Sequence, residues 1–448
     1  MGFIKDKRTN RSSFHRLALI PAAAAIAVFC SSPAQAGLLP TFSDPISSLP
    51  DAVIGGTPNL NVRVRYETVN QHNLPDNANG VIARARLGFT TKQWNGLFGK
   101  VEFQGITDIG DDQFNSTENG RVVPGNHYPT IADPSGSNFD QLYIGYAGLP
   151  DTVIRYGRQR IVYDNARFIG DVGWRQRMQT YDGVTLTGTW LPKLRFDYAY
   201  LTNIDSFQNI PNATYPGDPT TKNVALNATQ LFHLSYTAAH WLKLTGYTYL
   251  INFANDHVIP PLNFARRDTA TYGGRVTGKF SLHPVKLNYL LEYARQTGYA
   301  ASPSSVQANY YAAELGASYW RLFGKLDYEV LGGDGHYAFQ TPLYTGHAFQ
   351  GDADQFAFTP AAGMEDFYVT VGAKVEKAKL SAVWHNFNSN DSSSSRYGSE
   401  IDLKATRPIN KILSAGIGYA YYTADHNNIS GEGMNNVSKG WLWLVLKI

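Results

Sequence analysis

The sequence has little cysteine, little charge and no long apolar run beyond its N-terminal region. Its single cysteine, Cys30, lies in a segment that we expect to be removed, so the mature chain can form no disulfide. The histidines are scattered without a metal-binding spacing such as HExxH, and no cofactor or metal is predicted. No later stretch approaches 18 consecutive apolar residues, which excludes a transmembrane helix.

The first 36 residues have the pattern of a secretory signal peptide. A basic region with Lys5 and Arg16 is followed by the apolar residues 17–29 and the small-residue sequence 34–36. We expect residues 1–36 to be the signal peptide, 37–58 a short periplasmic segment and 59–448 one membrane domain. Removing the signal changes the net charge from +3 to about −1, and a nucleic-acid partner then loses its main support.

Beyond this region, apolar and polar residues alternate with a period of two in runs of about ten residues. Within residues 82–90, for example, Ala85 and Leu87 share one face, whereas Arg84 and Arg86 share the other. Successive side chains of a strand point to opposite faces. The pattern therefore predicts strands with one apolar and one polar face.

About eighteen such strands are predicted, joined in turn by about eight short turns and about nine longer polar loops. Short turns are expected at 92–96, 149–151, 191–192, 238–240, 281–284, 320–324, 377–379 and 407–410. An even number of strands returns both ends to the same side of a membrane, and closure pairs every backbone amide that faces lipid.

These features predict an all-β fold, a transmembrane antiparallel β-barrel of about eighteen strands with short periplasmic turns and long extracellular loops. Its place is the bacterial outer membrane, in contact with outer-membrane lipid. A secreted β-sandwich or propeller is the alternative, but the sequence shows no propeller-sized repeat.

The polar faces of the predicted strands carry many charges, and the basic ones concentrate in the first two thirds of the chain. They are Arg63, Arg65, Arg84, Arg86, Lys100, Arg158, Arg160, Lys193, Arg195, Arg275, Lys279 and Lys286. Acidic residues such as Glu292 and Asp366 come later in the sequence. A lumen with one cationic wall favours anions, although lumen charges can also neutralise one another and hold the barrel in shape.

The segment 156–182 is the most basic stretch of the predicted barrel. Its arginines are Arg158, Arg160, Arg167, Arg175 and Arg177. A guanidinium group donates two parallel hydrogen bonds to a carboxylate, so we expect Asp164 and Asp171 to orient some arginines while others line a constriction. With Arg63, Arg65, Arg84, Arg86 and Arg195, these arginines form the predicted pore and substrate-binding set.

Two long stretches resemble the alginate-export family of outer-membrane barrels. Residues 157–184 are similar to the hallmark of that family, and residues 328–356, with 359–360 and 364–366 after them, give a second match. The resemblance implies an eighteen-stranded barrel with an electropositive pore for a polyuronate. The second match contributes Asp334, His347, Asp352 and Asp354, to which we assign no role.

We therefore expect an outer-membrane channel that passes anionic solutes by passive diffusion through an arginine-lined pore. The solute would be a small organic anion or an anionic saccharide, including export of an alginate-like polysaccharide, and periplasmic export partners stay open. A barrel enzyme acting on lipid or polysaccharide is the alternative function, and an adhesion or scaffolding barrel is a third. The acidic pairs 111–112 and 352–354 have calcium-binding chemistry, but such loop clusters are usually just solvated.

Overall fold

The computed structural model describes residues 48–110, 113–116, 127–206, 224–254, 268–302, 304–391, 396–426, 428 and 433–448. The predicted signal peptide, most of segment 37–58 and the acidic pair 111–112 lie outside these ranges. No helix in the described part of the chain is long and apolar enough to cross a membrane.

One short helix, α1 (Leu49–Ile54), precedes the strands. The strands are β1 (Thr57–Gln71), β2 (Ala78–Thr90), β3 (Leu97–Asp108), β4 (Gly136–Leu149), β5 (Thr152–Gln159), β6 (Thr180–Gly188), β7 (Leu194–Asp205), β8 (Val224–Ala239), β9 (Leu242–Ile251), β10 (Thr269–Leu282), β11 (Val285–Gly298), β12 (Gln307–Tyr319), β13 (Leu322–Leu331), β14 (Met364–Val375), β15 (Ala378–Asn388), β16 (Arg396–Pro408), β17 (Leu413–Ala424) and β18 (Val437–Lys447).

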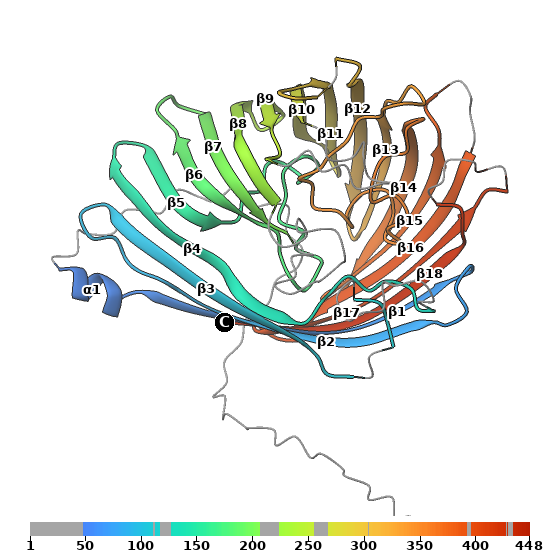
Figure 1. The fold of residues 1–448 in the computed structure, drawn as a ribbon, viewed down its shortest axis with the longest axis horizontal. Helices are drawn as coiled ribbons and strands as arrows, with labels where there is room; N and C mark the ends of the chain where they lie inside the picture. The colour runs from blue at the N-terminus through green and yellow to red at the C-terminus, as the bar shows by residue number, and fades with distance from the viewer. Residues whose placement is uncertain are drawn as a thin grey trace, which may run out of the picture.

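The strands form one closed antiparallel sheet of 18 strands, in which each strand pairs with its neighbours in sequence and β1 also pairs with β18 (Figure 1). The closing seam places Arg63 opposite Val445, and Leu60 and Ile448 exchange backbone hydrogen bonds of 3.1 and 2.8 Å. Closure leaves the sheet without an unpaired edge. The predicted barrel and its strand number are confirmed.

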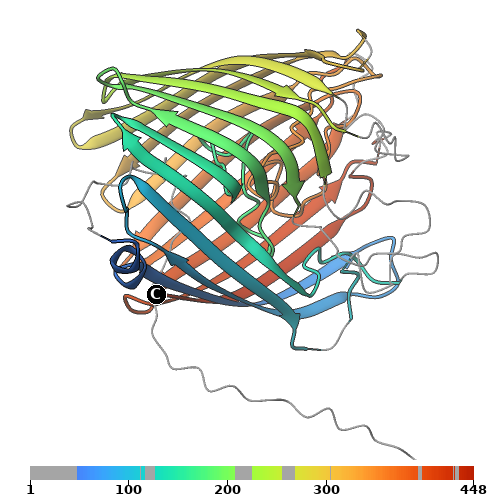
Figure 2. The same cartoon turned by 60° about the vertical axis from the view of Figure 1, so that its left-hand side comes forward.

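The connections alternate between short and long, as the sequence predicts. Short turns join β2 to β3, β4 to β5, β6 to β7, β8 to β9, β10 to β11, β12 to β13, β14 to β15 and β16 to β17. Three of these turns carry the exposed tryptophans Trp190, Trp241 and Trp320. Tryptophan is enriched where a membrane surface meets water, so these side chains mark one edge of the membrane. Helix α1 and the C-terminus lie at the same end of the barrel (Figure 2).

The two faces of the sheet differ in polarity. On β2, Arg84 and Arg86 are buried inside the barrel, whereas Leu87 is 63% exposed on the outside. Large apolar side chains are exposed in the same alternating way along the other strands, as Val101 and Phe103 are on β3. This apolar outer surface has the character of a lipid-facing band.

The apolar core lies inside the barrel because two long connections fold into it. We name them the arginine loop, residues 160–179 between β5 and β6, and the partner loop, residues 332–363 between β13 and β14 (Figure 1). Phe168 of the arginine loop packs against Tyr310 and Phe339, with ring centroids 5.1 and 5.7 Å apart. Ile169 and Leu343, one from each loop, form a parallel β-bridge and are fully buried.

The two loops contact each other closely at Gly170. Its N–H donates to the carbonyl of Leu343 at 2.8 Å, and the N–H of Thr345 donates to the carbonyl of Ala166 at 3.1 Å. A Cβ at position 170 would lie 2.8 Å from the backbone nitrogen of Thr345, so glycine permits this approach. The loops therefore form one joined unit across the lumen.

Candidate functional site

Arg63 and Arg65 of β1 hold the arginine loop against the barrel wall. Arg63 donates to the carbonyl of Gly173 at 3.1 Å, to Oε1 of Gln176 at 2.8 Å and to the carbonyl of Arg175. The main partners of the Arg63 guanidinium group are thus neutral oxygens of the loop. This contact explains why β1, more than 100 residues away in sequence, positions the loop.

Arg65 is the most completely buried of the predicted site residues on β1, with 1% of its surface exposed. Its guanidinium group pairs with Asp133 and lies 3.1 Å from Glu67. It also donates to the carbonyl of Trp174 at 2.7 Å and lies 4.8 Å from the centre of that indole ring. Arg65 therefore joins β1, the β3–β4 connection and the arginine loop.

Arg84 and Arg86 of β2 continue this contact along the wall. Arg84 donates to the carbonyl of Gln176 at 3.3 Å and to the side chain of Asn61. Arg86 contacts the sulfur of Met178 and lies 3.8 Å from Asp140. Both arginines are buried beneath the loop.

Arg158, Arg160 and Arg195 are the predicted site residues with the most exposed side chains, between 22 and 27%. Each is paired with carboxylates of the wall. Arg158 binds both oxygens of Asp182, at 2.7 and 2.8 Å, Arg160 pairs with Glu102 and Asp140, and Arg195 pairs with Asp197 at 2.7 Å.

Arg167 and Arg177 are buried and anchor the arginine loop to different strands. Arg167 pairs with Glu329 of β13 at 2.6 Å and lies 4.7 Å from the ring centre of Phe349. Arg177 pairs with Asp205 at the end of β7, at 2.9 Å. The arginine loop is thus fixed to two separate parts of the barrel wall.

Arg175 belongs to a charged cluster where the two loops meet. Its Nη2 lies 2.9 Å from Oδ2 of Asp354, and Nζ of Lys439 lies 2.8 Å from the same oxygen. Nδ1 of His347 lies 3.0 Å from the other carboxylate oxygen, and the imidazole stacks on Trp174 at 4.4 Å. Burial alone would raise the pKa of Asp354, but Lys439, His347 and Arg175 hold it well below its ordinary value.

Asp164 and Asp171, which we expected to orient arginines, make different contacts. Asp164 lies 2.8 Å from Nε2 of His233 and 3.5 Å from Nζ of Lys243, because the loop turns there toward β8 and β9. Burial would raise the pKa of Asp164, but the hydrogen bond and charge of His233 lower it to about 2. Asp171 holds the loop through its backbone carbonyl, which accepts the N–H of Gln179 at 2.8 Å.

The carboxylates that orient the arginines therefore lie mostly on the wall and on other connections. They include Glu67, Glu102, Asp133, Asp140, Asp205, Glu329 and Asp354. No local spacing links these residues to the arginine loop in the sequence. Lys439 is different, because it shares the inward face of β18 with Trp441 and the alternation there could have identified it.

Two of the second-motif acids that resembled a calcium site are paired with bases instead. Asp352 lies 2.8 Å from Nζ of Lys404, as Asp354 does from Lys439. Asp334 accepts the N–H groups of His336 and Tyr337, at 2.8 and 2.7 Å, and shapes the start of the partner loop. Within the described residues no group of acidic and histidine side chains has the arrangement of a metal site.

Two cavities lie on either side of the partner loop. The loop-side cavity, of about 420 Å³, is bordered by strand ends next to long connections, at Gln71 and Val437. The turn-side cavity, of about 400 Å³, is bordered by the middle of β12 to β16. Both are lined by His347, Phe349 and Gln350, so these residues separate the two spaces.

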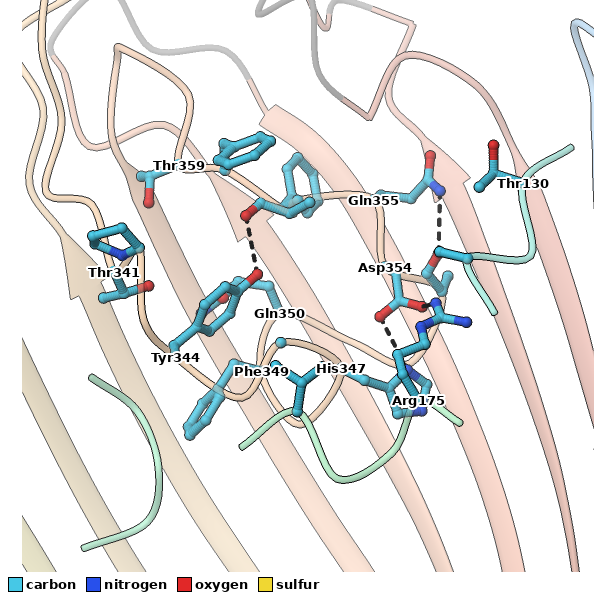
Figure 3. Close-up of a pocket in the computed structure, with 18 of the residues that line it drawn as sticks. Thr130, Arg175, Thr341, Tyr344, His347, Phe349, Gln350, Asp354, Gln355 and Thr359 are labelled. Atoms are coloured by element: carbon cyan, nitrogen blue, oxygen red, sulfur yellow. Dashed lines mark hydrogen bonds and ion pairs between the residues drawn. The ribbon is translucent and has the colours of Figure 1, made fainter. Parts of the chain in front are cut away.

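The loop-side cavity has a charged side and an aromatic side. Arg175, Asp354 and His347 group together, and Tyr344 and Phe349 lie across from them (Figure 3). The cavity therefore offers both charged groups and aromatic rings to a bound solute.

A family model described as alginate export matches residues 58–389. The chain belongs to the alginate export family. No curated protein matches the sequence. With this family membership and its closed barrel, the protein is a porin-like β-barrel of the bacterial outer membrane.

Solved structures share the fold of this alginate export family member at low sequence identity. OccAB2 of Acinetobacter baumannii superimposes with a TM-score of 0.66 at 13% identity, over 89% of this chain and 99% of its own. OccD3 (OpdP) of Pseudomonas aeruginosa gives 0.63 at 12%, over 89% and 92%, and OccK9 (OpdG) of the same organism gives 0.65 at 12%, over 89% and 99%.

Proposed function

We propose that this alginate export family member is a channel through which small anionic solutes, carboxylates above all, diffuse passively across the outer membrane. The observation that carries this proposal is that Arg63 and Arg84 form hydrogen bonds with uncharged oxygens. These two residues lie opposite each other on β1 and β2, both are buried, and their hydrogen bonds go to carbonyl and amide oxygens. Within the described residues neither takes part in an ion pair.

Two like charges opposite each other in a sheet repel, and the repulsion is stronger away from bulk water. Neutral oxygens stabilise the guanidinium groups but do not cancel their charge. The wall beneath the arginine loop therefore keeps a positive potential, which lowers the energy of an anion in the adjacent lumen.

Further cations extend this positive wall along the barrel. Lys439 is opposite Val69 and Lys447 is opposite Asn61 across the β1–β18 seam. Lys439 and Lys447 are eight residues apart on β18, which corresponds to about 27 Å along a strand. Cations thus continue toward both ends of the passage, as electrostatic guidance of an anion requires.

The reversal potential of the purified protein in a planar lipid bilayer under a KCl gradient tests the proposal. We expect a conducting channel that prefers chloride over potassium. Replacing Arg84 with glutamine keeps a hydrogen-bond donor but removes the charge, and should lower the permeability ratio about twofold. Lys377→Gln, at an exposed turn between β14 and β15, makes the same charge change outside the lumen and should leave the ratio unchanged.

A channel that prefers potassium, or has no preference, would overturn the anion proposal. A folded barrel that never conducts would overturn the channel and favour the enzyme alternative. A vesicle uptake assay with an acidic oligosaccharide tests whether the solute is an alginate-like polysaccharide. The oligosaccharide must cross the vesicle membrane if the pore serves such a chain.

A further inference from the structure

We propose that the loop-side cavity is a binding site for a carboxylate that carries a compact aromatic body. This inference rests on the proposed function and narrows its substrate class. It comes from three properties of the cavity: its few charges, its aromatic lining and its size.

The charges that line the loop-side cavity are those of Arg175, Lys439 and Asp354, besides the imidazole of His347. Two cations thus face one carboxylate within the lining. Lys439 is the cation with spare donors, because an ammonium group has three N–H donors and its ion pair is with Asp354 alone in the described part of the protein. It is also 6% exposed, so a carboxylate that reached it would be shielded from water.

The opposite side of the cavity offers aromatic rings. Phe349 and Phe356 are already engaged, by Arg167 at 4.7 Å and by Phe387 at 5.0 Å respectively. Phe358 is half-buried and makes no ring–ring or cation–ring contact with the described residues. A ring bound beside Phe358 would cover apolar surface that is now open, which favours an aromatic ligand over a small hydrophilic one.

The amide side chains around the cavity have partners within the protein. Gln340 donates to the carbonyl of Thr359 at 2.8 Å, and Gln350 donates to Glu329. Gln355 donates to the carbonyl of Ala353 at 3.2 Å. A sugar with many hydroxyl groups would have to compete with these bonds, whereas a single carboxylate needs only the donors of Lys439.

The size of the cavity fits one small molecule. A volume of about 420 Å³ lies in the range of small-ligand pockets. Its floor is closed by His347, Phe349 and Gln350, which also line the turn-side cavity. A ligand would therefore pause above this partition before crossing.

The test is block of the chloride current through single channels of the purified protein. Phenylacetate should halve the current at a concentration about tenfold lower than acetate, since only phenylacetate also buries a ring. Phenylacetamide, which has the ring without the charge, should block no better than acetate.

Phe358→Ala should weaken block by phenylacetate about tenfold, with Phe358→Leu intermediate. Lys439→Gln should weaken it as well, and Lys439→Arg should restore it.

Folding of each variant is checked by its heat-modifiable mobility on gels, so a misfolded barrel is not scored. Equal block by acetate and phenylacetate, or by phenylacetamide and phenylacetate, would overturn this inference while an anion-preferring reversal potential keeps the proposed function. A reversal potential without anion preference in the wild-type protein would instead overturn the proposed function. A Phe358→Ala channel with unchanged phenylacetate block would reject the aromatic contact.

Discussion

Two parts of the barrel wall differ in which charged side chains they present and in what those side chains bind. The wall formed by β1 and β2 presents arginines that bind the backbone of the arginine loop, as Arg63 and Arg84 do. The wall formed by β11 to β16 presents carboxylates, some of which pair with bases of the same wall, as Glu314 pairs with Lys325 at 2.7 Å. Further inward acids on that second wall are Glu292, Asp327, Glu329, Asp366, Glu400 and Asp402.

This contrast shows where the positive charges lie in the barrel and which groups they bind. On the first wall the arginines donate to loop carbonyls and thereby hold the arginine loop in place. On the second wall some carboxylates pair with lysine or histidine, as Asp366 does with His385 at 3.0 Å. In the proposed channel, a solute would pass between these two walls.

The largest effect is expected from removing the charge that holds the first wall to its loop. Arg65→Met leaves Asp133 and Glu67 buried without their main partner and should lower the free energy of unfolding by about 3 kcal/mol. Urea unfolding in lipid vesicles measures this. Arg321→Met, at an exposed turn, is the matched control and should change it by less than about 0.5 kcal/mol. Equal stability of the Arg65→Met and Arg321→Met proteins would contradict the anchoring role.

The same change at Arg167, where the arginine loop contacts the second wall, should have a smaller effect. Arg167→Met removes the partner of Glu329, but the hydroxyl of Tyr310, at 2.7 Å, still donates to that carboxylate. We expect a loss of about 2 kcal/mol in unfolding free energy and a larger single-channel conductance, because the loop is freed from β13. A loss greater than that of Arg65→Met would reverse the comparison.

Acid should release the arginine loop from β8. The pKa of Asp164 is about 2 in the folded protein, below its ordinary value of 3.8, because His233 outweighs the effect of burial. A lowered pKa stabilises the fold above about pH 4, and the stabilisation is lost as the pH falls toward 2. Unfolding free energies should show the wild type about 2 kcal/mol more stable than Asp164→Asn at pH 5, with the gap closing near pH 2. A gap independent of pH would exclude this ionisation.

The smallest effect is expected on ion preference. Asp402→Asn on the second wall should raise the chloride-to-potassium permeability ratio, and Lys447→Gln at the seam beside the first wall should lower it, each by less than about twofold. Glu376→Gln, at an exposed turn, is the matched control for the acid. The reversal potential measures both changes. Shifts in the same direction would mean that the walls do not differ in their effect on ions.

Some features of the candidate site could be predicted from local sequence. Inward placement of Arg84 and Arg86 follows from alternation alone, because adjacent side chains of a strand face opposite ways. Clustering of arginines in residues 160–179 was visible as composition. The sequence did not show which of these arginines pair with carboxylates, since the partner of Arg175, Asp354, lies 179 residues away. Asp164 lies 2.8 Å from His233, a residue of β8 that no local pattern links to it.

The sequence by itself determined the barrel: its 18 strands, their two faces and the position of each short turn, since strand alternation and turn chemistry involve neighbouring residues only. The tertiary structure alone decided that two long loops fold inward and meet at Ile169 and Leu343. That contact depends on burying apolar side chains from distant segments against one another, and no local pattern encodes such a partner. The lumen's charge arrangement follows from the same long-range packing, because covering an arginine with a loop changes what a solute can reach.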